Sequence, residues 1–443
     1  MAKKNDTMEK LVSLAKRRGY VFPSSEIYGG FGSTWDYGPL GTELIRNIKE
    51  AWWRDVVLAH DNVVGINASI LMSPEIWKAS GHLEHFSDPL VECGNCRRRF
   101  RPDDLAKPDQ CPVCGKKQLG EARQFNTMFK TFVGPVEDEA AVAYLRPETA
   151  QAIFVNFKSV QQASRARMPF GIAQIGKAFR NEITTGNFLF RTREFEQMEM
   201  EFFVEPGDDE RWFDFWVKER VDWFHRYGIP EEKLQLRAHD PEELAHYSLG
   251  TTDIEYEFPF GWSEIEGIAR RGDYDLRMHQ EASGKDLTYF DQAANEHILP
   301  WVVEPSAGVD RAALAFLSQA YAEEEIESAK GEMETRVVLK LDPRLAPTKV
   351  AFFPLIKKEP LQEMAHRLQD ESRFEWTTFY DEAGAIGRRY RRQDEAGTPF
   401  CVTVDFDSLE DDAVTVRDRD TLKQDRVAVA ELTAYLREKL AWR

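Results

Sequence analysis

The chain has 443 residues, of which 42% are hydrophobic and 12% are aromatic. A chain longer than the roughly 250–300 residues of a single core is expected to form two or more domains. Its net charge of -18 argues against indiscriminate coating of nucleic acid, which requires a basic surface, but leaves room for an RNA bound at local basic patches. No apolar window approaches the ~18 residues of a membrane span, and the N-terminus lacks a signal peptide's apolar core, so we expect a cytoplasmic protein.

The N-terminal part predicts two helices separated by a glycine-rich loop. Residues 8–19 suit a short helix that ends at Gly19, and Pro39 suits the first turn of the second helix. An apolar stripe then recurs at spacings of four, at Leu40, Leu44, Ile48 and Trp52. The loop lacks the G-K-[ST] that follows a phosphate-binding loop, so we interpret its aromatic residues as interface packing.

Four of the five cysteines form a C-x2-C-x14-C-x2-C pattern: Cys93, Cys96, Cys111 and Cys114. In a reducing compartment this spacing favours a metal over disulfides, and two thiolate knuckles suit a tetrahedral zinc ion. Four thiolates leave no open position, so the zinc is expected to be structural; a degenerate ribbon that folds without metal remains the alternative. Cys401 alternates within a predicted strand and is expected to be a small buried hydrophobe.

From residue 125 onward the sequence predicts a series of strands and turns. They lie at 125–129, 144–157, 179–203, 254–258, 264–276 and 301–317. A helix at 212–228 separates the third of these from the rest. Its rings are expected to be core rather than a stacking platform: Trp212, Phe215, Trp216, Trp223 and Phe224.

The run FRNEITTGNFLFRTREFEQMEMEFF, at 179–203, predicts a hairpin around the turn TTGN. Because side chains alternate faces along a strand, Phe195, Gln197 and Glu199 share one face of the second strand. Rows of carboxylates on a solvated face would be unremarkable. A mixture of arginine, aromatic ring and carboxylates, however, can clamp a phosphate, stack a base and receive an ammonium group.

A second arginine supports a phosphate site. The stretch EPSAGVDRAALAFL predicts a strand that enters a helix, with Asp310 near the helix N-terminus and Arg311 in the first turn. Two arginines from separate elements, Arg180 and Arg311, would suit a polyphosphate if they converged on one sheet.

Two prolines in LDPRLAPTKV place a domain boundary near 342–349. Beyond it, predicted strands at 349–356, 376–381, 401–406 and 413–420 alternate with helices at 361–369, 384–397 and 427–440, which indicates a small α/β domain with a mixed sheet. A local positive patch is formed by Arg388, Arg389, Arg391 and Arg392. Taken alone, such a cluster is more often a solvated face than an RNA contact.

These motifs together resemble the class II aminoacyl-tRNA synthetases. FRNE…FRTREFEQME is similar to their motif 2, EPSAGVDRAALAFL to motif 3, and YGPLGTELIRNIKEAWW to motif 1, the dimer-interface helix. The segments LRPETAQAIFVNF and EPSAG and the C-terminal block that begins with GAIGRRYRRQDEAG resemble, more narrowly, the dimeric type of glycyl-tRNA synthetase. The resemblance runs from Tyr28 to the C-terminus.

The resemblance implies an α+β fold, in which a class II antiparallel sheet is flanked by helices. Residues 1–342 would be the catalytic domain, with a zinc-ribbon-like insertion at about 90–118, and residues 349–443 an α/β anticodon-binding domain. In such a domain the arginine cluster at 388–392 would favour contact with tRNA. The implied activity is glycine–tRNA ligation through glycyl-adenylate. ATP with Mg²⁺, glycine, tRNA(Gly) and structural Zn²⁺ would be bound by a homodimer; no DNA or membrane partner is expected.

The resemblance also assigns residues. Arg180 would stabilise the ATP α-phosphate, Arg311 would hold the γ-phosphate and Glu264 would carry Mg²⁺, and these are the implied catalytic residues. The implied ATP site consists of Arg180, Asn181, Glu182, Phe190, Arg191, Thr192, Arg193, Glu194, Phe195 (against adenine), Glu264, Ile265, Gly308, Val309, Asp310 and Arg311. The implied glycine site consists of Arg101, Glu148, Phe195, Glu196, Gln197, Met198, Glu199, Glu304, Pro305, Ser306, Ala307 and Gly308.

Three other functions are open at this point. Another class II synthetase is the nearest rival, and the EPSAG segment speaks against it. A non-catalytic, synthetase-like RNA-binding or accessory protein would be expected to have lost the arginines that hold phosphate. In a zinc-ribbon nucleic-acid-binding protein, the ribbon would occupy only a small part of this length.

Overall fold

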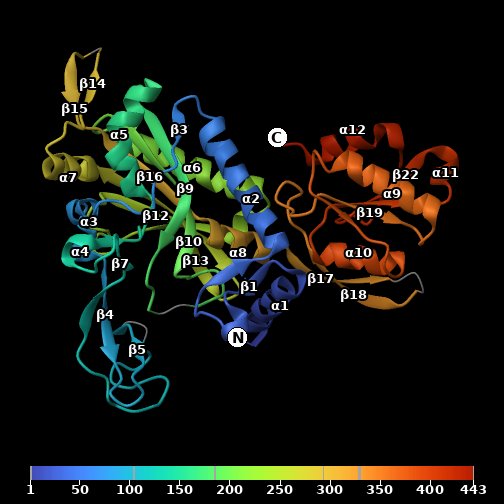
Figure 1. Cartoon of the computed structure of the whole chain (residues 1–443), viewed down its shortest axis with the longest axis horizontal. Coiled ribbons are helices and arrows are strands. Elements are labelled where there is room, and N and C mark those ends of the chain that lie inside the picture. The colour runs from blue at the N-terminus through green and yellow to red at the C-terminus, as the bar shows by residue number, and fades with distance from the viewer. Residues whose placement is uncertain (1, 103–104, 184–185, 293, 328–330, 443) are drawn as a thin grey trace.

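The computed structural model describes residues 2–102, 105–183, 186–292, 294–327 and 331–442. Figure 1 shows a large N-terminal body, a smaller C-terminal body coloured orange to red, and a thin arm that projects from the large body around β4 (Ser87–Glu92) and β5 (Arg99–Phe100). Within the described ranges, no helix combines the length and the apolar character needed to cross a membrane.

A seven-stranded sheet forms the centre of the large body, in the order β11-β12-β13-β16-β10-β9-β3. Its strands are β3 (Val63–Gly65), β9 (Phe170–Phe179), β10 (Glu194–Val204), β11 (Leu234–Ala238), β12 (Gly250–Phe258), β13 (Gly261–Gly272) and β16 (Trp301–Gly308). Neighbouring strands are antiparallel except β3 and β9, which run parallel. The predicted class, an antiparallel sheet flanked by helices, is confirmed.

One face of this sheet is covered by a large apolar core. The helices on this side are α2 (Pro39–Trp53), α6 (Asp209–Arg226) and α8 (Val309–Ala320). Because side chains alternate along a strand, Met198, Met200 and Phe202 of β10 all point into this core. The predicted stripe of α2 is buried in the same core at Leu44, Ile48 and Trp52.

The opposite face is covered by α5 (Ala150–Ser164) and α7 (Tyr274–Ser283). The prediction of strand and turn for 144–157 is wrong from Ala150 onward, because these residues form a helix. The apolar positions Ile153, Phe154 and Phe157 recur at helical spacing and pack against Phe203 of β10.

The predicted hairpin exists, but its turn is much longer than TTGN. β9 ends at Phe179, which pairs with Glu194 at the start of β10. Arg180 and Glu182 therefore lie in the connecting loop rather than in the first strand. Thr184 and Thr185 of the TTGN turn lie outside the described residues. The loop brings Phe190 and Arg191 back toward the sheet.

The other elements of the large body surround the sheet and build the arm. They are α1 (Ala2–Arg18), β1 (Val21–Pro23), β2 (Trp35–Tyr37), α3 (Pro74–Ala79), α4 (His82–His85), β6 (Arg123–Asn126), β7 (Lys130–Phe132), β8 (Val142–Tyr144), β14 (Tyr289–Asp291) and β15 (Glu296–Ile298), with 3-10 helices at 26–28, 139–141 and 231–233 and a π-helix at 54–58. The first helix is longer at its start than the predicted 8–19. Among the predicted core rings of α6, Phe215 is 37% exposed.

The smaller body is built on a mixed five-stranded sheet, in the order β20-β19-β21-β22-β23. Its elements are β19 (Val350–Pro354), α9 (Glu359–Ser372), β20 (Thr378–Tyr380), α10 (Ile386–Glu395), β21 (Phe400–Val404), α11 (Ser408–Asp411), β22 (Ala413–Asp418), β23 (Gln424–Ala428) and α12 (Val429–Leu440). The predicted alternation and mixed sheet are confirmed. The sequence did not reveal β23, a largely exposed edge strand of polar residues, and Cys401 is buried as expected.

The predicted basic patch on α10 is wrong in part. Arg389 is buried and donates to the carbonyls of Pro354 and Leu355, so it holds the loop after β19. Arg391 and Arg392 form ion pairs with Glu334 and Asp381. Three of the four arginines of this cluster, Arg389, Arg391 and Arg392, therefore have partners within the protein.

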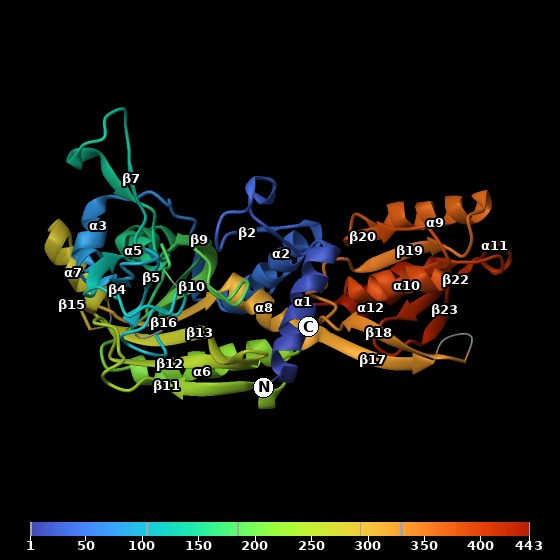
Figure 2. The ribbon, with the colours of Figure 1, turned by 90° about the horizontal axis from the view of Figure 1, so that it is seen from below.

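A hairpin of β17 (Tyr321–Glu327) and β18 (Met333–Leu339) links the two bodies. Figure 2 shows it running from the large body beneath the smaller one. Arg336 of β18 donates to Asp394 of α10 at 2.8 Å, and Arg417 of β22 donates to the same carboxylate at 2.8 and 3.0 Å. All three side chains are buried, so one carboxylate neutralises two guanidinium groups where the hairpin meets the small body.

We expect Asp394→Asn to destabilise this junction by about 3–5 kcal/mol, because it takes the anion from the buried Arg417 and one of two anions from Arg336, which also pairs with Glu324. Thermal unfolding of the variant should show a clearly lower melting temperature. Glu334→Gln, which removes the charge of the half-exposed partner of Arg391, is the matched control. It should lower the free energy of unfolding by less than about 1 kcal/mol. Equal shifts in both variants would contradict this interpretation.

Candidate active site

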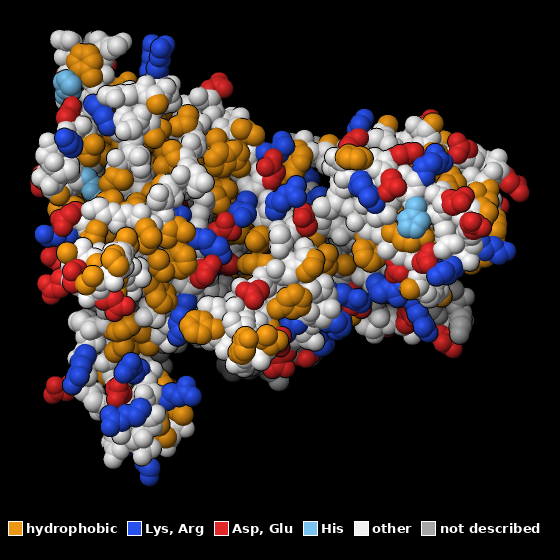
Figure 3. Space-filling model, in the orientation of Figure 1, with side chains coloured by type: hydrophobic (Ala, Val, Ile, Leu, Met, Phe, Trp, Pro, Cys, Tyr) orange, Lys and Arg blue, Asp and Glu red, His pale blue; other side chains and the backbone are white. Residues whose placement is uncertain are grey.

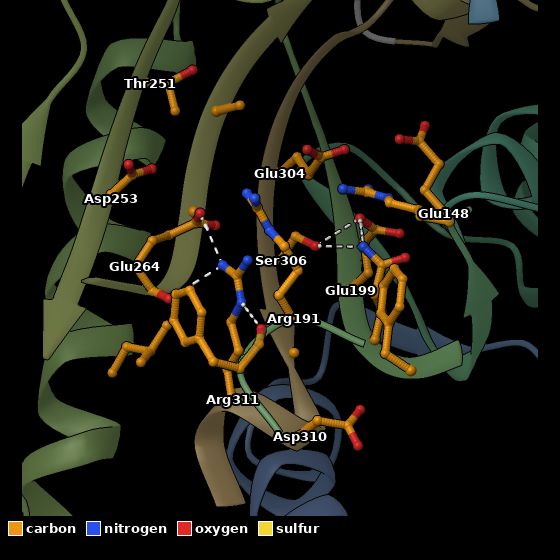
Figure 4. Close-up of a pocket in the computed structure, with 18 of the residues that line it drawn as sticks. Glu148, Arg191, Glu199, Thr251, Asp253, Glu264, Glu304, Ser306, Asp310 and Arg311 are labelled. Atoms are coloured by element: carbon orange, nitrogen blue, oxygen red, sulfur yellow. Dashed lines mark hydrogen bonds and ion pairs between the residues drawn. The ribbon is translucent and has the colours of Figure 1, made fainter. Parts of the chain in front are cut away.

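A cavity of about 320 Å³ opens on the face of the seven-stranded sheet that carries Gln197 and Glu199 of β10. Its walls come from β10, β12, β13, β16, the loop between β9 and β10, and the first turn of α8. Figure 4 shows side chains from these elements pointing toward one another across it. The strand alternation that buries Met198 and Met200 on the other face places the polar residues here.

Both predicted arginines line this cavity, although they are far apart in the sequence. The Nε of Arg180 donates to the carbonyl of Pro147 at 2.9 Å, and its guanidinium lies 5.4 Å from the ring centre of Phe195. The Nε of Arg311 donates to the carbonyl of Phe190 at 3.2 Å, and its guanidinium lies 4.4 Å from the Phe190 ring. Each arginine is thus held by a backbone carbonyl and an aromatic face.

Arg311 also forms an ion pair with Glu264 of β13, at 2.9 Å (Figure 4). Burial acts to raise the pKa of Glu264, but the pairing with Arg311 outweighs it and holds the pKa below its usual range. The carboxylate is therefore charged near neutral pH, and this wall of the cavity carries an anion beside a cation.

A cluster of carboxylates occupies the other part of the cavity. Glu199 accepts hydrogen bonds from the backbone N–H of Thr149 at 3.1 Å and from the hydroxyl groups of Thr149 and Ser306, the latter at 2.7 Å. Burial and the nearby Glu148 raise the pKa of Glu199, while the bonds from Thr149 and Ser306 oppose that rise. The register of β10 with β16 sets Glu199 directly opposite Ser306.

Two further carboxylates face the same space, each with its own cationic or polar partner. Glu148 lies 3.2 Å from the Nε2 of His82, and Glu304 accepts from Arg271 at 2.6 Å. Burial acts to raise the pKa of Glu148, but His82 outweighs it and the pKa is lowered. The groups in this cluster are almost fully buried, so the cavity offers a preformed arrangement of acceptors for a cation.

The structure brings together most of the residues implied by the resemblance. Those that line the cavity are Glu148, Arg180, Glu182, Phe190, Arg191, Thr192, Phe195, Gln197, Glu199, Glu264, Ile265, Glu304, Ser306, Gly308, Asp310 and Arg311. Asp310 accepts from the hydroxyl group of Tyr37 at 2.6 Å and from the backbone N–H of Glu196 at 3.0 Å, so it also fixes the start of α8.

The remaining implied residues lie outside the cavity lining. They are Arg101, Asn181, Arg193, Glu194, Glu196, Met198, Pro305, Ala307 and Val309. Met198, Ala307 and Val309 belong to the apolar core on the other face of the sheet. Glu196 pairs with Lys49 of α2 at 3.0 Å. Arg101 follows β5 in the arm.

Several lining residues were not found from the sequence: His239, Glu243, Ala245, Tyr247, Thr251, Asp253, Gly267 and Ala269. The residues from 239 to 247 belong to a connection whose position depends on the tertiary structure. Gly267 and Ala269 did carry a signal, because small residues at alternate positions of a buried strand leave space above it. A Cβ on Gly267 would lie 3.7 Å from both Asp253 Oδ1 and Glu264 Oε1.

The four cysteines of the predicted ribbon come together in the arm. Their Sγ atoms all lie within 4.8 Å of one another, and the pairs Cys93–Cys114 and Cys96–Cys111 are 3.6 Å apart. All four are free thiols. A tetrahedral zinc ion bound at ~2.3 Å from each sulfur requires sulfur atoms roughly 3.8 Å apart, so this donor set fits such an ion.

Residues 132–344 match the family described as tRNA synthetase class II core domain (G, H, P, S and T), and residues 349–439 match the anticodon binding domain. Among solved structures, a prolyl-tRNA synthetase from Cryptosporidium parvum aligns with a TM-score of 0.66 at 13% identity, over 97% of this chain and 74% of that one. That similarity shows a shared fold.

Curated proteins are similar at a much higher level of identity. The glycine–tRNA ligase of Thermobifida fusca is 54% identical over 100% of both chains. Those of Streptomyces coelicolor and Corynebacterium glutamicum are 54% and 55% identical and each align over 98% of this chain, with 99% and 98% of their own length covered. This chain therefore belongs to the glycine–tRNA ligase family and carries a class II synthetase core.

Proposed function

We propose that the cavity on the seven-stranded sheet is the active site of a glycine–tRNA ligase, which activates glycine with ATP and transfers it to the 3′ end of tRNA(Gly). The observation that carries this assignment is the convergence of Arg180 and Arg311 on one cavity beside a buried carboxylate cluster. The arginines suit a triphosphate, and the carboxylates suit the ammonium group of an amino acid. Family membership supports glycine as that amino acid.

ATP is proposed to lie along the arginine side of the cavity. Arg180 would hold the α-phosphate, where charge develops during the reaction, and Arg311 the γ-phosphate. Phe195 and Phe190 offer aromatic faces beside these two arginines, and the position of the Phe195 ring against Arg180 supports its role against adenine. Mg²⁺ supplies charge neutralisation when it is bound with ATP, and Glu264 is the carboxylate proposed to hold it.

Glycine is proposed to lie at the carboxylate side. Glu148, Glu199 and Glu304 would accept the three N–H bonds of its ammonium group. Ser306, which is fixed by its bond to Glu199, would lie near the α-carbon. A side chain on the substrate would have to displace groups that are already bonded to one another, which costs roughly 1–3 kcal/mol for one extra methyl group in a filled site.

The reaction needs no nucleophilic side chain. The carboxylate of glycine attacks the α-phosphorus of ATP, which forms glycyl-adenylate and releases pyrophosphate. The terminal ribose hydroxyl group of the tRNA then takes the glycyl group and releases AMP. The protein contributes position and charge, which are the main sources of catalysis in phosphoryl-type transfers.

The rest of the chain is proposed to bind the tRNA. We assign residues 1–342 to the catalytic domain and 349–443 to the anticodon-binding domain, which the family match at 349–439 supports. Basic side chains also gather on the arm, as Figure 3 shows at its lower end. Arg97 and Arg99 there are 78% and 63% exposed and share one carboxylate, Glu92, at 3.1 and 3.0 Å, so the pair keeps a net positive charge toward a phosphate backbone.

ATP–pyrophosphate exchange with each amino acid in turn tests the function. We expect exchange with glycine, and a kcat/KM for alanine at least ~10-fold lower because of the filled pocket. Exchange with a different amino acid alone would indicate a sister synthetase. No exchange with any amino acid would indicate a non-catalytic relative.

Arg180→Ala and Arg311→Ala should each lower the rate of exchange by roughly 10²–10³-fold, because each removes a preorganised cation from the site. Arg211→Ala, which removes a largely exposed arginine of α6, is the control and should exchange at the wild-type rate. Circular dichroism would show that all three variants are folded. An Arg180→Ala variant with full activity would refute the phosphate site.

Zinc analysis of the purified protein should find about one ion per chain, because four thiolates complete one tetrahedral site. Cys114→Ser should lose most of that zinc and make the arm more sensitive to a protease. Cys401→Ala, which changes the buried cysteine of the smaller body, should keep it. A wild-type protein free of zinc would show that the ribbon folds without metal.

The chain is proposed to act as a homodimer. Three apolar side chains between β1 and β2 are strongly exposed, namely Ile27 at 89%, Tyr28 at 87% and Phe31 at 63%. A cluster of this kind is typical of a protein–protein contact. Sedimentation velocity should give the mass of two chains for the wild type and a shift toward one chain for Tyr28→Asp. A monomeric wild type would contradict this proposal.

A further inference from the structure

The proposed glycine site has a fourth carboxylate behind it. Glu201 follows Glu199 by two positions on β10, so both side chains point to the same face of the sheet. The register of β10 with β16 on either side of this point puts Glu201 opposite Glu304. Carboxylate oxygens of these three residues lie within 4.8 Å of one another. Glu199 and Glu304 line the cavity and Glu201 does not, so Glu201 lies beneath them.

Glu201 differs from its neighbours in what surrounds its oxygens. Glu199 accepts hydrogen bonds from Thr149 and Ser306, and Glu304 accepts one from Arg271. Both oxygens of Glu201 are buried, yet no N–H or hydroxyl group in the described part of the chain donates to either of them. The residue is 0% exposed. An ionised carboxylate in this position would have neither water nor a donor to stabilise it, which is strongly unfavourable.

The charged groups that act on Glu201 come from three strands. They are Glu199 on its own strand, Glu304 on β16 and Arg271 on β13. Arg271 is already shared, since it donates to both oxygens of Asp275 at 2.8 and 2.9 Å as well as to Glu304. Among the groups that act on Glu201, the acids outnumber the one arginine, Arg271, and a proton is the simplest remaining counter-charge.

The position of that proton follows from the contacts. Arg271 bonds to Glu304 directly, which favours the ionised form of Glu304, and it makes no such bond to Glu201. Burial and the charge of Glu304 raise the pKa of Glu201 well above its usual range. Burial also raises the pKa of Glu304, to about 8, although Arg271 opposes that rise. The contact between the two carboxyl groups acts to raise the pKa of Glu201 and to lower that of Glu304, so Glu201 holds the proton more strongly.

We propose that Glu201 is a neutral carboxylic acid that donates a hydrogen bond to Glu304 and so holds Glu304 in place for the ammonium group of glycine. Glu201 is a positioning residue, since it touches Glu304 and not the substrate. The O–H of Glu201 and the guanidinium of Arg271 fix Glu304 from two sides and leave its other lone pairs free for the ligand. Only the identity of that ligand rests on the proposed function.

Two substitutions test whether Glu201 acts as a neutral hydrogen-bond donor or as a charged carboxylate. Glu201→Gln keeps the shape, stays neutral and still carries a donor, so its KM for glycine in pyrophosphate exchange should stay within about twofold of the wild type. Glu201→Ala removes the donor, and its KM for glycine should rise about tenfold or more with a smaller change in kcat. A rise in Glu201→Gln as large as in Glu201→Ala would overturn the proposal. If Glu201→Ala does not fold, the KM of Glu201→Gln for glycine tests the proposal by itself: a value near that of the wild type supports it, and a large rise overturns it.

Infrared difference spectroscopy of the full chain at neutral pH detects the proton without any turnover. The wild-type minus Glu201→Gln spectrum should contain the carbonyl stretch of a neutral carboxylic acid. The matched control is Asp209→Asn, which removes a carboxylate that is equally buried but paired with Arg270 at 2.6 Å, and its difference spectrum should lack this band. Absence of the band for Glu201 would overturn the proposal, as would a divalent metal found in the three-carboxylate cluster. If the wild type fails to exchange pyrophosphate with glycine, the proposed function fails, but the infrared band still decides where the proton lies.

Discussion

A charge that is removed from water has to be compensated inside the protein, and this constraint decides how the central sheet is built. One face of β10 buries Met198, Met200 and Phe202 in an ordinary apolar core. The other face buries acids, and Glu148, Glu199 and Glu304 each have a partner supplied by a different element. Arg271 is the common point, because it binds Glu304 and Asp275 and lies 3.6 Å from the ring centre of Tyr247. Removing one partner from such a network leaves a buried charge uncompensated, which also disturbs the remaining groups. The effects of substitutions within the network are therefore not expected to be independent.

The same constraint explains why the site is ready before any ligand binds. Arg311 rests on the ring of Phe190 and pairs with Glu264, and Arg180 is held by the carbonyl of Pro147. Arginines that are fixed in this way would need little reorganisation to bind the proposed polyphosphate. Preorganised charge of this kind is the largest single contribution to catalysis in many enzymes, and it requires no nucleophile.

The sequence predicted the sheet and the two arginines because these depend on local patterns. Strand alternation places Gln197 and Glu199 on one face, and the strand-to-helix junction places Arg311 in a first turn. The helix at Ala150–Ser164 was missed although its apolar residues recur at helical spacing. The partners of the carboxylates could not be predicted, since His82, Arg271 and the Tyr247 ring beside Arg271 come from segments that meet only in the folded chain. For Arg389 the local pattern gave a wrong prediction. A run of basic residues predicts an exposed side chain, whereas Arg389 is buried and donates to two backbone carbonyls.

In the proposed site, the division of charge would also fix the direction in which glycine binds. Its ammonium group would be drawn to Glu148, Glu199 and Glu304, and its carboxylate would be repelled by the same residues. The carboxylate would therefore point toward Arg180, where the α-phosphate of ATP is proposed to lie. A residue that holds Glu304 from beneath acts on this orientation as well as on affinity, since a shift of Glu304 would move the ammonium group and with it the attacking oxygen. Because a misplacement of about 1 Å can slow such a reaction by roughly 10²-fold, the buried acid behind the pocket belongs to the geometry of the reaction as much as to the stability of the sheet.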